Sequence, residues 1–188
     1  MRLHPTAPYW DRGWPNVPDM TGARDLMDAG DLRDLSAALG FALPLSRVLD
    51  VGCGTGRIAR YCDGYLGADI APSCVEYCVR HGLDAVQMSG AHDLPAGEFG
   101  WVVCLSVFTH MARPERLEYL AAFRDRAPRL LVDIIPGDGS GDVAMWTADP
   151  ATFVGDVVAS GYAIVAECED EAEIGDYQHR YYRAERTR

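Results

Sequence analysis

The sequence of 188 residues lacks the features that would place it in a membrane or outside the cell. No apolar run approaches the roughly 20 residues that a membrane-spanning helix needs. The stretch from Met1 to Pro5 is too polar and too rich in proline for a signal peptide. Its 48% of hydrophobic and 24% of charged residues are typical of one globular domain with a full-sized core. We therefore expect a soluble, cytoplasmic protein that makes no contact with a membrane.

Patterns typical of metal sites and disulfides are also missing. The six cysteines form no C-x-x-C pair and show no zinc-ligand spacing. Cys74 and Cys78 are four residues apart and could share one face of a helix. Small, buried thiols that stay reduced are the better interpretation, and we expect no metal site. The six are Cys53, Cys62, Cys74, Cys78, Cys104 and Cys168.

An excess of basic residues is absent as well. The sequence has 17 basic and 28 acidic residues, which gives a formal net charge of −11. Enzymes that act on nucleic acids usually carry a basic surface, so this balance argues against DNA or RNA as a substrate. No internal repeat or low-complexity tract is visible either, so a repeat architecture is excluded.

Strands and helices alternate from residue 47 onward. Short apolar runs predict buried strands, and longer segments with apolar residues at helical spacing predict helices. Pro72 and Pro114 stand where helices begin, and Gly161 stands where one ends. This alternation predicts an α/β fold with a mostly parallel sheet and helices on both faces. The predicted strands are 48–51, 65–70, 83–88, 101–105, 130–135, 165–169 and 177–184, and the predicted helices are 58–62, a segment that begins at 72, 114–127 and 150–160.

The segment that precedes these units differs from them in composition. Residues 1–20 hold four prolines, which exclude a regular helix. They also hold Tyr9, Trp10 and Trp14, which are too aromatic for a solvated tail. Residues 24–39 then predict one amphipathic helix or two short ones. We expect the aromatic arm to fold over part of the main domain.

The strongest local motif follows the first predicted strand. It reads Asp50-Val51-Gly52-Cys53-Gly54-Thr55-Gly56 and precedes a predicted helix. Glycines allow close approach of the backbone to a ligand, and the exposed amides at a helix start bind polar or anionic groups. A phosphate loop would need a lysine after its glycines, and a dinucleotide loop would need a glycine where Arg57 stands. The spacing is instead G-x-G-x-G, with an acid two residues before the first glycine.

This motif resembles the first motif of the class I S-adenosylmethionine-dependent methyltransferases, in particular those that act on small molecules. Residues 67–70, 91–95 and 104–110 resemble later blocks of that family, in order and at suitable separations. The resemblance implies a Rossmann-like seven-stranded sheet whose last strand is antiparallel. It also implies S-adenosylmethionine as the cofactor and methyl transfer as the reaction. The similarity extends from residue 47 to about residue 186.

The resemblance further implies which residues bind the cofactor. Asp69 ends the second predicted strand, where its carboxylate could accept hydrogen bonds from both ribose hydroxyls, although it could instead cap the next helix. Asp50 would reach the amino group of the cofactor, often through water. Ile70 would pack on the adenine, Ala91 would offer backbone groups to its edge, and Leu105 would line the methionine side. The backbone around the methionine part would come from Gly52, Cys53 and Gly54.

Two positions depart from the family pattern. Gly90 and Gly100 stand where the family often has aspartate. At Gly90 the missing side chain is one that recognises the adenine amino group. Ser89 or Asp93 could substitute for it, although Asp93 fits a turn equally well. These departures favour one alternative, a methyltransferase-like scaffold without catalytic activity.

The chemistry of methyl transfer leaves few marks on a sequence. The protein must place the acceptor in line, about 3 Å from the methyl carbon, and a base is needed only if the acceptor must lose a proton. His110, just past the fourth predicted strand, is the candidate base, and the competing role for it is to hold the loop. We expect residues 1–46 and Trp146 to form a lid over a cofactor-binding domain of residues 47–188. A small-molecule acceptor is expected, with a nucleic acid or protein acceptor as the alternative.

Overall fold

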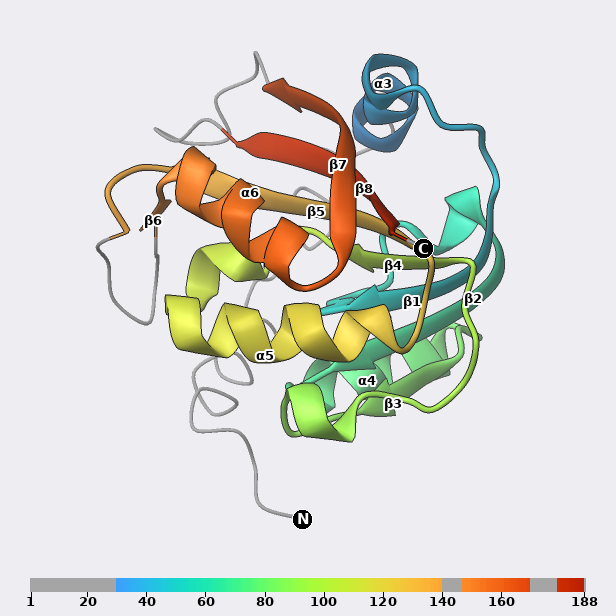
Figure 1. Ribbon diagram of the computed structural model, residues 1–188. Helices are drawn as coiled ribbons and strands as arrows, with labels where there is room; N and C mark the ends of the chain where they lie inside the picture. The colour runs from blue at the N-terminus through green and yellow to red at the C-terminus, as the bar shows by residue number, and fades with distance from the viewer. Residues whose placement is uncertain (1–29, 140–146, 170–178, 188) are drawn as a thin grey trace.

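The computed structural model describes residues 30–139, 147–169 and 179–187, which build one mixed sheet with helices around it (Figure 1). Across the sheet the strands follow the order β3-β2-β1-β4-β5-β8-β7, and a two-residue strand β6 pairs with the end of β5. Neighbouring strands are parallel except where β8 pairs with β5 and with β7. The predicted Rossmann-like sheet with an antiparallel last strand is confirmed, and β6 is an addition to it. The strands are β1 (Leu45–Val51), β2 (Cys62–Asp69), β3 (Ala85–Gln87), β4 (Trp101–Cys104), β5 (Arg129–Pro136), β6 (Thr147–Ala148), β7 (Tyr162–Glu169) and β8 (Arg180–Arg186).

The parallel strands end together at one edge of the sheet. β1 lies between β2 and β4, so the chain leaves β1 toward one half of the sheet and later returns to the other half. The register places Val51 beside Ala68, and Asp50 beside both Gly67 and Val103. The loops that follow β1, β2 and β4 therefore meet at a topological switch point, which is where open α/β sheets bind ligands.

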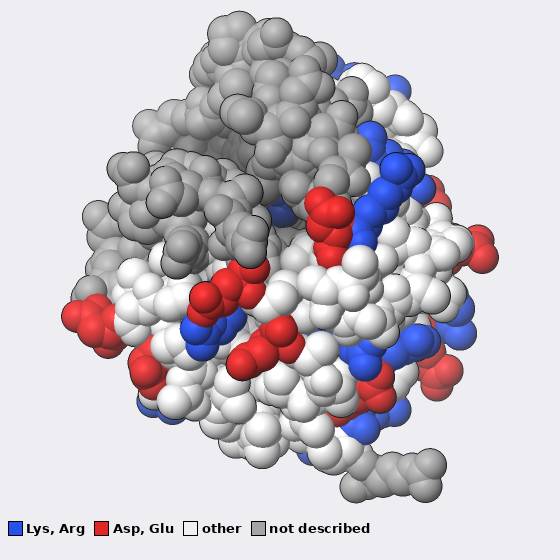
Figure 2. All heavy atoms as spheres, turned by 90° about the horizontal axis from the view of Figure 1, so that it is seen from above, with Lys and Arg blue, Asp and Glu red and all other residues white. Residues whose placement is uncertain are grey.

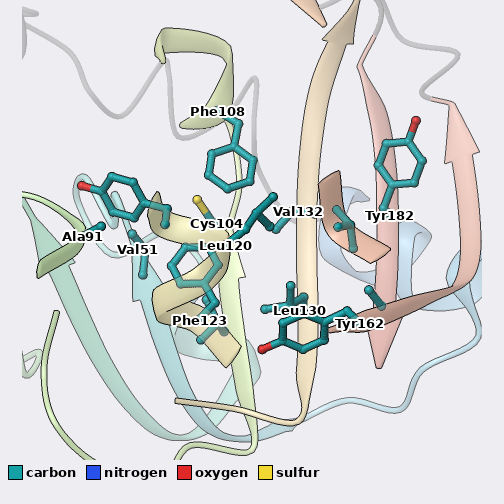
Figure 3. Close-up of a cluster of buried hydrophobic side chains, with 14 of the residues drawn as sticks. Val51, Ala91, Cys104, Phe108, Leu120, Phe123, Leu130, Val132, Tyr162 and Tyr182 are labelled. Carbon is teal, nitrogen blue, oxygen red and sulfur yellow. The ribbon is translucent and has the colours of Figure 1, made fainter. Parts of the chain in front are cut away.

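Helices cover both faces of the sheet, as predicted. On one face, α5 (Arg113–Arg124) and α6 (Pro150–Ala159) lie in front of the strands (Figure 1). Their apolar side chains, such as Leu120 and Phe123, pack against buried strand residues in the larger core cluster (Figure 3). On the other face, α3 (Gly30–Leu39) contributes Leu32, Leu35 and Leu39 to a second core cluster. The fourth helix, α4 (Pro72–Arg80), packs against β2 and β3 and begins at the predicted proline.

We call residues 50–56 the glycine loop. The helix that follows this loop is shorter than predicted. In place of the helix expected over 58–62, the structure has a single turn of 3-10 helix, η1 (Ala59–Tyr61). The turn stops there because Cys62 is already extended and pairs with Leu45 as the first residue of β2. The second strand consequently starts three residues before the predicted strand 65–70.

Several predictions concern residues outside the described ranges. The helix expected over 24–39 is observed from Gly30 onward, and its earlier part lies outside the described residues, as do residues 1–20 and Trp146. Within the described ranges, no helix is long and apolar enough to cross a membrane. No group of three or more histidine, cysteine, aspartate or glutamate side chains in those same ranges is arranged to hold a metal ion.

Candidate cofactor site

The glycine loop is anchored to both neighbouring strands. At its start, the backbone N–H groups of Gly52 and Cys53 donate to the carbonyl oxygen of Ala68 in β2, with N···O distances of 2.8 and 3.3 Å. Gly52 has φ +71°, and a Cβ atom there would lie 2.2 Å from Cγ2 of Val107, which follows β4. Only glycine fits this position without a shift of the neighbouring chain. The loop is therefore bonded to β2 and lies against the segment that follows β4.

Asp69 joins the end of β2 to the glycine loop. One carboxylate oxygen, Oδ2, accepts a hydrogen bond from the Gly54 amide at 2.8 Å, and Oδ1 accepts one from the Ala71 amide, also at 2.8 Å. The side chain is 7% exposed, and this burial raises its pKa, while the bonds from Ala71 and Gly54 lower it. Ala71 immediately precedes α4, so one oxygen satisfies an amide at the helix start as the alternative interpretation expected. Each oxygen has a second lone pair for a further donor.

Asp50 is the second carboxylate of the site. The Tyr65 hydroxyl donates to its Oδ2 at 2.9 Å. Burial raises the pKa of Asp50 from its ordinary value of 3.8 to about 7, although the Tyr65 hydrogen bond and the nearby charge of Arg57 both lower it. Asp50 is therefore able to change its charge near neutral pH. Neither Tyr65 nor Arg57 was singled out from the sequence as part of the site.

The other residues named from the sequence surround the loop in different ways. Cys53 is buried within the loop, and the thiol of Cys78 from α4 donates to the Gly54 carbonyl at 3.3 Å. Ile70 is half-buried against the larger core, and Leu105 is half-buried against the second core, so the two lie toward opposite faces of the sheet. Ala91 is buried and begins η2, a 3-10 turn over Ala91–Asp93.

The structure shows what surrounds Gly100 and Gly90, the two positions that depart from the family pattern. A Cβ atom at Gly100 would lie 2.4 Å from the carbonyl oxygen of Ser46, so any larger residue would collide with the backbone of β1. Near Gly90, the Ser89 hydroxyl donates to Oδ2 of Asp93 at 3.0 Å, which pairs the two side chains that could substitute for the missing aspartate. The glycine at position 100 thus has a packing reason that is independent of any ligand.

His110 ends η3, a 3-10 turn over Phe108–His110 that follows β4. Its side chain is partly buried, and its backbone N–H donates to the carbonyl oxygen of Val107 at 2.9 Å. Val107 is the residue that faces Gly52, so the turn and the glycine loop are in contact through it. His110 therefore lies at the carboxyl edge of the sheet, where the candidate base was expected, and both roles considered for it remain predictions.

A set of hydrogen-bonded polar residues beyond β4 was not predicted from the sequence. Ser106 has φ +60°, and its backbone N–H donates to Oδ1 of Asp133 in β5 at 2.7 Å. The other oxygen of Asp133, Oδ2, lies 2.6 Å from Nδ1 of His179, which immediately precedes β8. The Ser106 hydroxyl accepts a hydrogen bond from Nη2 of Arg57 at 3.4 Å. One signal was available, because Asp133 interrupts the apolar run of residues 130–135 in β5, and a buried acid there needs partners.

Comparison with known proteins agrees with this geometry. Residues 49–124 match the family model described as a methyltransferase domain. The fold is similar to a crystal structure of magnesium protoporphyrin IX methyltransferase from Synechocystis PCC 6803 with bound SAH, with a TM-score of 0.70 and 19% identity over 89% of this chain and 84% of that chain. It is also similar to 1,6-didemethyltoxoflavin-N1-methyltransferase from Burkholderia thailandensis, with a TM-score of 0.64 and 17% identity over 97% and 84% of the two chains.

The domain match and the fold agree with each other. Residues 49–124 match a methyltransferase domain, and the fold is similar to that of solved methyltransferase structures, among them a SAM-dependent one, as the glycine motif predicted. Among curated proteins it is similar to the ubiquinone biosynthesis O-methyltransferase of Xanthomonas campestris pv. campestris, with 30% identity over 118 residues. This match covers 56% of the present chain and 46% of that relative, so the chain spans about half the length of the curated relatives it matches.

Proposed function

We propose that this protein transfers a methyl group from S-adenosylmethionine to a small-molecule acceptor. The observation that carries the proposal is the contact between the glycine loop and Asp69. The Asp69 carboxylate accepts a hydrogen bond from the Gly54 amide at 2.8 Å. This arrangement lies at the switch point of the sheet, next to the second carboxylate, Asp50. A fold shared with structures that hold S-adenosylmethionine or SAH adds support.

The residues present fit such a ligand. A Cβ atom at Gly54 would meet no atom within 4 Å, so the loop is open on the side where a ligand would approach. The carboxylates of Asp50 and Asp69 suit an ammonium group and a pair of hydroxyls, and neither would favour a phosphate. We assign Asp69 to the ribose and Asp50 to the amino group, directly or through water.

The remaining contacts follow from where each residue lies. Gly52, Cys53 and Gly54 would surround the methionine part through their backbone groups. Ile70, directly after β2, would pack on the adenine, and Ala91 would offer backbone groups to its edge. Leu105, directly after β4, would line the methionine side of the cofactor.

The chemistry asks little of the protein beyond placement. When bound, S-adenosylmethionine supplies an already activated methyl group on a sulfonium. The residues around the site then hold the acceptor in line and exclude water, which removes most of the entropic part of the barrier. His110 stays a candidate for taking a proton from the acceptor or for holding the loop after β4.

A small acceptor is supported by two observations. The proteins named above are a ubiquinone biosynthesis O-methyltransferase, a magnesium protoporphyrin IX methyltransferase and a 1,6-didemethyltoxoflavin-N1-methyltransferase. Acidic and basic side chains are also interspersed over the described part of the face in Figure 2, without the single-sign basic patch that nucleic acid would favour.

Calorimetry with SAM and SAH tests the proposal directly. Asp69→Asn should weaken binding of both by about 10- to 100-fold, because the amide would turn a donor toward the backbone amides and the ribose. Asp84→Asn, an exposed aspartate near the start of β3, is the matched control and should leave binding unchanged. If the parent protein binds neither compound, the scaffold alternative replaces the enzyme.

A further inference from the structure

We propose that His179, oriented by Asp133, is the base that takes a proton from the acceptor, which leaves His110 the other role considered for it, that of holding the loop after β4. This inference rests on the proposed methyltransferase function and makes the acceptor class more specific. An acceptor that needs such a base carries a hydroxyl or an ammonium group, because a thioether, a tertiary amine or an ionised oxygen has no proton to lose before transfer. The geometry of the pair, its place in the sheet and its connection to Ser106 each support the assignment.

The contact between the two side chains determines which ring nitrogen carries the proton. Asp133 is fully buried, and its Oδ2 lies 2.6 Å from Nδ1 of His179. An ionised carboxylate only accepts hydrogen bonds, so Nδ1 must carry the hydrogen. In the neutral ring the lone pair is then on Nε2, and Nε2 is the atom that can accept a proton. A carboxylate that holds a histidine in one tautomer also stabilises the imidazolium formed afterwards.

Asp133 is itself held from a second side. Its Oδ1 accepts the backbone N–H of Ser106 at 2.7 Å, so each carboxylate oxygen has a partner in a different segment of the chain. Ser106 adopts a left-handed conformation, with φ +60°, which is unfavourable for a residue with a side chain, and in this conformation its amide reaches Asp133. Ser106 directly follows Leu105, the residue assigned to the methionine side of the cofactor, which carries the methyl group. The pair is thus tied to the place where the methyl group would be.

The antiparallel direction of β8 explains how a distant residue reaches this edge. β5 runs toward the carboxyl edge of the sheet, whereas β8 starts there, with Ile134 paired to Arg180 and Asp133 paired to Tyr181. His179 is two residues before Tyr181, so both side chains lie on the face that Asp133 occupies. The Asp133 side chain is 0% exposed and that of His179 is 10% exposed, so the imidazole is the member of the pair that reaches the surface.

The step balances without any further reactant. The acceptor oxygen or nitrogen forms a bond to the methyl carbon while the bond from that carbon to the sulfonium breaks, and the sulfur leaves as a neutral thioether. The acceptor proton passes to Nε2 of His179, and the imidazolium lies against the Asp133 carboxylate. Solvent then removes the proton and restores the neutral ring.

The test combines a readout of the tautomer with a readout of turnover. On protein labelled with ¹⁵N at histidine, long-range ¹H–¹⁵N spectra should show His179 with the hydrogen on Nδ1, assigned by the loss of its signals in His179→Gln. In Asp133→Asn, the side-chain oxygen can still accept a hydrogen bond from the Ser106 amide. The side-chain NH₂ group would then donate a hydrogen bond to Nδ1 of His179. The hydrogen of His179 should therefore move to Nε2 in this variant.

Turnover should be followed as SAH formation with catechol and with 4-nitrocatechol, which is largely ionised near neutral pH. His179→Gln and Asp133→Asn should lower turnover of catechol at least about 100-fold and that of 4-nitrocatechol far less. His81→Gln, an exposed histidine at the end of α4, is the control and should match the parent protein. SAH affinity should stay unchanged in all three variants.

Two results would overturn the assignment. One is a parent spectrum in which His179 carries its hydrogen on Nε2, and the other is an equal loss of turnover for both catechols in His179→Gln. Failure of the underlying function gives a different result, since the parent protein would then bind no SAH while the tautomer of His179 could still be read from the spectra.

Discussion

The two halves of the carboxyl edge are built in different ways. On the cofactor side, the groups that meet are close in sequence, since Gly54 and Asp69 are 15 residues apart and Asp50 and Tyr65 are also 15 apart. On the side that we assign to the acceptor, Ser106 and Asp133 are 27 residues apart, and Asp133 and His179 are 46 apart. The first half is organised largely by backbone amides and glycine geometry. The second half depends on side chains that the sheet brings together.

This contrast predicts different responses to substitution. Cofactor binding should be lost when the backbone of the glycine loop is disturbed. Turnover should be lost when a single polar atom of Asp133 or His179 is changed. A residue such as Val107, which contacts Gly52 and follows β4, connects the two halves. Substitutions on the cofactor side can therefore measure how far the two halves act independently.

The largest effect is expected from Gly52→Ala. The new methyl group would lie 2.2 Å from Val107 in a left-handed conformation, so the free energy of unfolding should fall by roughly 3 kcal/mol or more. Gly54→Ala also has positive φ, but it meets no atom within 4 Å and should cost only about 1 kcal/mol. Urea unfolding without ligand measures both values.

Val107, which the new methyl group of Gly52→Ala would meet, supplies the control for this comparison. Adding Val107→Ala to Gly52→Ala removes the atom that the new methyl group would meet, so the double variant should recover part of the lost stability. Equal destabilisation by Gly52→Ala and Gly54→Ala would show that backbone conformation alone decides the loop, and that contact with the acceptor half contributes nothing.

A smaller effect on stability and on SAH affinity is expected when pH changes the charge of Asp50. Burial raises the pKa of this acid from 3.8 to about 7, so the folded state binds more protons than the unfolded state between these values. The free energy of unfolding contributed by Asp50 should therefore fall as pH rises from about 4 to about 7. Ionised Asp50 favours a ligand ammonium, so SAH affinity should rise about tenfold between pH 6 and pH 8.

Calorimetry at a series of pH values checks this profile. Asp50→Asn removes the titrating group, so SAH affinity should become weak and independent of pH over the same range. A profile that keeps its slope in Asp50→Asn would assign the titration to another group and contradict the role of Asp50.

The smallest effect is expected from Tyr65→Phe. The Tyr65 hydroxyl donates to Oδ2 of Asp50 and lowers the pKa of that acid. Loss of a hydrogen bond worth about 1 kcal/mol should move the midpoint of the SAH affinity profile upward by roughly 0.5–1 pH unit. Affinity above pH 8 should change little. A midpoint that stays in place would mean that Tyr65 has no influence on the charge of Asp50.

The same contrast explains how much could be predicted from the sequence. The spacing of Asp50, Gly52 and Gly54, followed by Asp69 at the end of the next strand, is a local pattern, and it predicted both the methyltransferase domain match and the fold. The helix expected over 58–62 proved to be one 3-10 turn because the start of β2 is determined by pairing with β1, which no local pattern reports. Asp133 and His179 were missed for a related reason, since their proximity depends on which strand lies beside β5.

The entry of β8 from the carboxyl edge also limits which changes in chain length the protein can accept. One residue inserted between His179 and Arg180 would turn the imidazole away from Asp133 to the opposite side of the sheet. Two inserted residues would restore the side but displace the ring by about 7 Å along the strand. Variants and homologues that keep this pair should therefore show no insertion or deletion between positions 179 and 181, where Tyr181 pairs with Asp133, even where neighbouring loops differ in length.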